Sequence, residues 1–69
     1  MRPEEAVRYL MSHYGLTRSH AFTWLKSARA VASHSKVFSS PDGESVRVTA
    51  TDSGERDRNG VIWHYEVTS

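Results

Sequence analysis

Apolar residues recur at helical spacing near the start of the chain. One side of a helical wheel collects Ala6, Val7, Leu10, Met11 and Tyr14. Pro3 suits the first helical position, because its missing N–H group would have no partner there. Gly15 suits the left-handed residue that often follows a helix. The pattern predicts a helix over about residues 3–14.

A second helical pattern follows after a short connection. Its apolar side collects Ala21, Trp24, Leu25, Ala28 and Ala32. Thr17 can cap this helix, because a threonine hydroxyl accepts a hydrogen bond from a backbone N–H in the first turn. The pattern predicts a helix over about residues 18–33. Since only two or three residues join the helices, we expect an antiparallel or angled pair.

The second half of the chain alternates apolar and polar residues, which is typical of strands. Residues 45–51 and 61–67 predict a β-hairpin, and residues 37–39 predict a short strand before the turn at Pro41 and Gly43. Pairing Arg47 with Glu66 would place every apolar side chain on one face, and a slip of one residue would destroy that match. We expect the polar residues 53–60 to form a mobile loop.

These elements predict one α+β domain over residues 1–69, with two helices, a short strand and a hairpin, loosely like a winged helix. A chain of 69 residues has room for one domain. It has no cysteine, so disulfides and thiolate metal sites are excluded, and its histidines lack metal-site spacing. We expect no cofactor. Neither a signal peptide nor a long apolar run appears, so we expect a cytoplasmic protein that is not inserted in a membrane.

Charge divides the chain into unlike halves, although the net charge is only +1. Residues 1–36 carry six lysines and arginines against two carboxylates, giving +4, and residues 37–69 carry three against six, giving −3. A basic helical half suggests a surface that faces a polyanion.

This charge pattern and the helix-turn-helix outline favour a small nucleic-acid-binding regulator of transcription. In a winged helix, the second helix presents its first residues to base edges, and hairpin arginines reach phosphates. We expect the contacts to come from Arg18, Ser19, His20, Thr23, Lys26, Arg29, Arg56 and Arg58. Either DNA or RNA would fit.

The helical pair also resembles the first two helices of the ANTAR domain, a helical RNA-binding module of bacterial antitermination regulators. The residues that carry the resemblance are Ala6, Leu10-Met11, Tyr14-Gly15-Leu16-Thr17, Ala21-Phe22, Leu25 and Ala28. They span about a third of the chain and mostly pack two helices together. The family continues into a third helix and often has an acidic residue where this chain has Arg18. The resemblance implies RNA as a ligand.

A protein partner is the alternative. A small sheet covered by only two helices leaves aromatic residues that mark an interface with a partner or with a second copy, and we expect Trp24, Trp63 and Tyr65 there. In this alternative, the chain is an inhibitor encoded by a phage or plasmid that binds a host protein through its sheet and these aromatic residues. Catalysis is not expected, because the chain lacks a nucleophile elbow, a glycine-rich phosphate loop and paired carboxylates.

Overall fold

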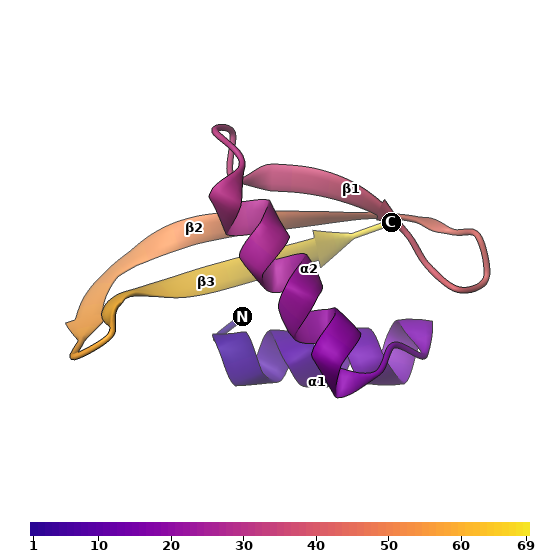
Figure 1. The fold of residues 1–69 in the computed structure, drawn as a ribbon, viewed down its shortest axis with the longest axis horizontal. Helices are drawn as coiled ribbons and strands as arrows, with labels where there is room; N and C mark the ends of the chain where they lie inside the picture. The colour runs from indigo at the N-terminus through magenta and orange to yellow at the C-terminus, as the bar shows by residue number, and fades with distance from the viewer.

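A computed structural model describes all residues from 1 to 69 and has two helices followed by three strands. The order is α1 (Pro3–Tyr14), α2 (Arg18–Ala30), β1 (Ser35–Ser39), β2 (Ser45–Asp57) and β3 (Gly60–Thr68). In Figure 1, α2 crosses the sheet diagonally while α1 lies on the β3 side. The predicted α+β architecture is confirmed. Neither helix is long and apolar enough to cross a membrane.

The first helix has the predicted bounds, because local signals fix both of its ends. Pro3 is the first helical residue, and Glu4 and Glu5 occupy the first turn, where the helix dipole favours carboxylates. Gly15 has φ of 69°, and its N–H donates to the carbonyl of Met11 over 3.1 Å. Only a residue that tolerates positive φ can end the helix in this way.

The second helix starts as predicted and ends three residues early. The Thr17 side chain accepts the N–H of His20 over 3.1 Å, which confirms the cap. Val31 is already extended, and His34 has φ of 55°. The carbonyl of His34 then accepts the N–H of Ala50 over 2.7 Å, so the chain must leave the helix to join the sheet. Ala32, predicted on the apolar side of the helix, is exposed.

The sheet has the order β1-β2-β3 with antiparallel pairing throughout. The predicted register of β2 and β3 is wrong by two residues: Arg47 faces Thr68, and Glu66 faces Thr49. A shift of two residues keeps every side chain on the same face, so alternation alone cannot distinguish the two registers. The predicted apolar face is nevertheless correct, since Val46, Val48 and Ala50 are buried on the side of the helices.

The predicted mobile loop is wrong, because most of it belongs to β2 and extends the hairpin. Between the pairs Asp52–Trp63 and Arg56–Val61, three residues of β2 face the single residue Ile62. This bulge is held by the N–H of Gly54, which has φ of 82° and donates to the carboxylate of Asp52 over 2.8 Å. The sequence signals of a loop, glycine and polar residues, here mark a bulge and a tight turn.

A single apolar cluster joins the two helices to the sheet. Its buried members are Ala6, Val7, Leu10, Leu16, Ala21, Leu25, Ala28, Val48, Ala50 and Tyr65. They come from α1, α2, β2 and β3, with Leu16 in the connection between the helices. The opposite face of the sheet has no helix and carries polar side chains such as Arg47, Thr49 and Thr51. The helices therefore form one layer and leave one sheet face open.

Candidate nucleic-acid interface

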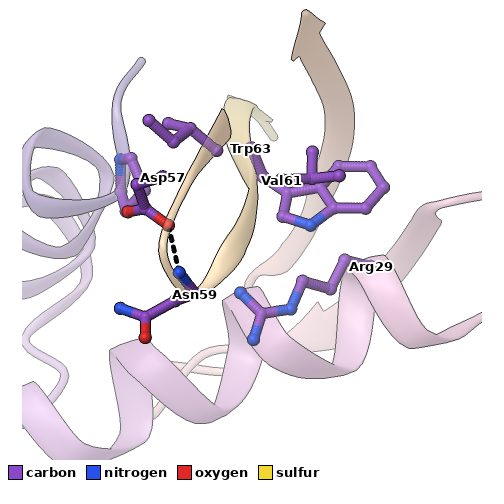
Figure 2. A pocket seen from close by; sticks show the side chains of 7 residues that line it. Arg29, Asp57, Asn59, Val61 and Trp63 are labelled. Carbon is purple, nitrogen blue, oxygen red and sulfur yellow. Dashed lines mark hydrogen bonds between the residues drawn. The ribbon is translucent and has the colours of Figure 1, made fainter. Parts of the chain in front are cut away.

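A cavity of about 370 Å³ lies where the end of α2, the start of α1 and the hairpin meet. The residues around it are Pro3, Arg29, Asp57, Asn59, Val61, Ile62 and Trp63. Figure 2 shows the guanidinium of Arg29 pointing toward the hairpin tip that carries Asp57 and Asn59. We call this feature the Arg29 cavity. It brings together the two regions in which sequence reasoning placed cationic contacts.

Arg29 lies in the last turn of α2, where the helix dipole favours a cation. Its Nη1 donates to the hydroxyl of Tyr65 over 3.3 Å, and Tyr65 is only 1% exposed. The guanidinium forms no ion pair, so its remaining N–H groups have no carboxylate to neutralise them. A guanidinium held at one nitrogen and free at the others can bind a phosphate.

The hairpin tip is ordered by its own backbone. The carboxylate of Asp57 accepts the N–H of Asn59 over 2.8 Å, which is the bond of an Asx turn. Gly60 has φ of 112° and returns the chain into β3. Arg58 is thereby fixed at the tip between two residues of the cavity wall. Its exposed side chain forms no ion pair.

The hairpin is also tied to the helical layer. Arg2, just before α1, forms an ion pair with Glu55 of the bulge over 3.4 Å. Both side chains are more than half exposed, so the ion pair contributes little stability. The pairing of β2 with β3 and the bulge therefore place the tip beside Arg29, and this exposed contact only adds to them.

Trp63 supplies an aromatic ring to the cavity. It is half-buried and meets His34 edge to face, with ring centroids 5.1 Å apart. An indole ring offers a stacking surface for a nucleobase, and the amide of Asn59 can donate and accept hydrogen bonds. The cavity thus combines a cation, a carboxylate, an aromatic ring and an amide. No three side chains among His, Asp and Glu gather to hold a metal ion.

The start of α2 is arranged differently from its end. Arg18 forms an ion pair with Glu4 of α1 over 2.5 Å, and its guanidinium lies 5.2 Å from the centre of the Phe22 ring. The hydroxyl of Thr23 donates to the carbonyl of Ser19 over 3.0 Å. Ser19 and His20 are exposed. Of the residues that a winged helix would present, Arg18 and Thr23 are therefore engaged with α1 or with their own helix, whereas the side chains of Ser19 and His20 form no hydrogen bond.

The remaining predicted cations divide into a paired and an unpaired group. Arg56 lies 3.9 Å from the carboxylate of Asp52. Lys26, one helical turn before Arg29, is exposed and forms no ion pair. The predicted cations without a carboxylate partner are thus Lys26, Arg29 and Arg58. The structure brings Arg29 to the tip that carries Arg58, although Arg58 does not line the cavity, while Arg18 lies at the other end of α2.

Among the predicted interface aromatics, Tyr65 is not available to a partner. It belongs to the buried core, because its side chain lies opposite Ala50 on the face of the sheet that the helices cover. Trp24 is half-buried and stacks on Phe38, with ring centroids 4.6 Å apart and planes at 8°. Trp63 remains accessible through the Arg29 cavity.

Two features of the Arg29 cavity were not predicted from the sequence. Asn59 lines the cavity, and the hydroxyl of Tyr65 positions Arg29. The segment Asp57-Arg58-Asn59-Gly60 could have indicated the tight turn, because the dipeptide Asn-Gly is typical of such turns. The contact between Arg29 and Tyr65 joins residues 36 positions apart, and nothing local indicates it.

Comparison with protein-family models, curated proteins and solved structures found no match to this chain. The similarity to the ANTAR helices therefore stays a prediction.

Proposed function

We propose that this domain is a non-enzymatic regulator in the cytoplasm that binds nucleic acid through the Arg29 cavity. The observation that carries the proposal is the convergence of the end of α2 and the hairpin tip on one cavity. Arg29 would bind a phosphate, and Trp63 would stack on a base. Lys26 and Arg58 would contact neighbouring phosphates.

This proposal moves the binding surface from the start of α2 to its end. The support is electrostatic: Arg18 and Arg56 already have carboxylate partners, whereas Lys26, Arg29 and Arg58 have none. A phosphate that contacted Arg18 would have to compete with Glu4. The Arg29 guanidinium forms no ion pair, although the Asp57 carboxylate lines the same cavity, and its fork of donors suits a phosphate.

Salt dependence tests the proposal. Binding of labelled DNA and RNA of mixed sequence is measured by fluorescence polarisation over a range of salt concentrations. With three cations in contact with phosphates, the logarithm of the affinity should fall against the logarithm of salt concentration with a slope between about −2 and −3. The absence of binding to both nucleic acids at low salt would contradict the proposal.

Arg58→Ala provides a local test, because Arg58 is exposed at a turn and contributes nothing to the core. It should reduce the steepness of the salt dependence by about one unit. The matched control is Arg47→Ala, which removes the same charge from the open face of the sheet. Equal effects of both substitutions would show that binding responds only to net charge.

A protein partner is the second candidate function. It is favoured by one observation, the free outer edge of β1, where the apolar side chain of Val37 is 49% exposed.

A further inference from the structure

One outer edge of the sheet is covered by another part of the chain, and the other edge is not. At the edge of β3, the N–H of Tyr65 donates to the carbonyl of Met1 over 2.7 Å, and the amino group of Met1 donates to the carbonyl of Tyr65 over 2.6 Å. The first residue of the chain therefore covers the middle of that edge. No segment covers the edge of β1. An uncovered edge offers unpaired backbone groups to another strand.

The outward backbone groups of β1 can be identified from the bonds at its two ends. Ala50 donates to the carbonyl of His34, and Ser40 donates to the carbonyl of Glu44. Even-numbered residues of this segment therefore exchange hydrogen bonds with β2, since antiparallel bonding alternates along a strand. The N–H and carbonyl groups of Ser35, Val37 and Ser39 point away from β2. These three residues form a regular edge without proline or bulge.

We propose that two copies of this chain join through their β1 strands, antiparallel, with Val37 on the two-fold axis. Each Val37 then exchanges both backbone hydrogen bonds with Val37 of the second copy. Ser35 of each copy pairs with Ser39 of the other. All three outward residues are used, and the two sheets become one sheet of six strands.

The side chains of β1 favour this register over its alternatives. Lys36 of one copy lies opposite Phe38 of the other, which extends a contact that already exists within the chain, where the Lys36 ammonium lies 5.4 Å from the Phe38 ring. A parallel arrangement in register, or a two-fold axis at Lys36, would set two like charges directly opposite each other. On the open face, the two exposed Val37 side chains bury each other. The strand is therefore complementary to itself.

The oligomeric state tests the proposal without any nucleic acid. Sedimentation equilibrium of the wild-type chain should give twice the monomer mass of 7.8 kDa as concentration rises toward the millimolar range. Val37→Lys places two cations opposite each other and should leave only monomer. Thr51→Lys is the matched control, because Thr51 is an exposed residue on the same open face but on the central strand, and this variant should still dimerise. A wild-type monomer at every concentration, or a dimer that survives Val37→Lys, would overturn the proposal.

Single cysteines test the register, because the chain has no cysteine of its own. Directly paired residues have Cα atoms about 5.5 Å apart, within the range that a disulfide can bridge. Oxidation of the Val37→Cys variant should therefore give a covalent dimer. Two copies of Ser39→Cys would lie about 13 Å apart along the strands and should stay uncoupled. Coupling through Ser39→Cys but not through Val37→Cys would overturn the proposed register.

Discussion

The two ends of α2 carry the same kind of cation in opposite settings. At the first turn, Arg18 contacts the carboxylate of Glu4. In the last turn, the Arg29 guanidinium donates only to the neutral hydroxyl of Tyr65 and borders a cavity that holds an aromatic ring and the Asp57 carboxylate. The comparison shows that a count of basic residues on a helix does not locate a binding surface. What matters is which cations the rest of the fold has already neutralised.

The largest expected effect comes from truncating a buried core residue in the middle of α2, because that residue holds both ends of the helix against the sheet. Leu25 lies between Arg18 and Arg29 in the sequence of α2 and is 2% exposed in the core. Leu25→Ala should lower the free energy of unfolding by about 2–5 kcal/mol, because it removes buried contacts and leaves a cavity. Urea denaturation would measure the loss. The control is Phe22→Ala, at a residue that is 36% exposed, and a larger loss there would contradict the assignment of the core.

The next effect separates the two ends of the helix. Thr17→Ala removes the side chain that accepts the N–H of His20, so the first turn of α2 should fray. The expected cost is about 1 kcal/mol of unfolding free energy, measured by urea denaturation. Nucleic-acid affinity of the folded protein should not change, since the cap lies at the end opposite Arg29. A loss of affinity as large as that caused by changes at the Arg29 cavity would contradict the distinction between the two ends.

Tyr65→Phe tests whether the Tyr65 hydroxyl positions the Arg29 guanidinium for binding. It removes the hydroxyl that accepts a bond from Arg29 and keeps the buried ring. We expect a loss of about 1 kcal/mol in unfolding free energy and a loss of affinity of about two- to twelvefold, measured by polarisation, because roughly 0.5–1.5 kcal/mol is then needed to order the guanidinium on binding. Tyr14→Phe is the control, because its hydroxyl makes no hydrogen bond within the chain. Equal losses of affinity in both variants would contradict the role of the Tyr65 hydroxyl in positioning Arg29.

The smallest effect is expected at the ion pair of the opposite end. Glu4→Gln removes the carboxylate partner of Arg18, and both side chains of this pair are about half exposed. Exposed pairs contribute about 0–1 kcal/mol, and salt screens them. The change in unfolding free energy should stay within that range and disappear in high salt. A loss of several kcal/mol would mean that the pair organises the helical layer.

The helices could be predicted from the sequence, because their ends depend on local groups. Pro3, Gly15 and Thr17 act within their own turns, and the structure confirms each of them. The exit from α2 could not be predicted, since the bond between Ala50 and His34 draws the chain into the sheet after Ala30. The apolar face of the hairpin was also predictable from alternation.

The register and the cavity could not be predicted, for related reasons. Alternation has a period of two, so it cannot detect a shift of two residues. That shift moves Tyr65 from a position opposite Val48 to one opposite Ala50, and the extension of β2 to Asp57 carries the tip to Arg29. Arg29 precedes Asn59 by 30 residues and Trp63 by 34 residues in the sequence. Their meeting depends on a bulge at Gly54, where the sequence indicated only a loop.

The most direct test compares Arg29→Ala with Arg18→Ala, which remove the same charge from the two ends of α2. Polarisation with labelled nucleic acid at low salt measures both affinities, and circular dichroism confirms that both variants are folded. A hydrogen bond to a charged group contributes about 1.5–3 kcal/mol, so Arg29→Ala should weaken binding by about tenfold or more. Arg18→Ala should change it by less than about twofold, as expected for a cation already neutralised at the surface. Equal losses, or a larger loss at Arg18, would contradict the assignment of binding to the Arg29 cavity.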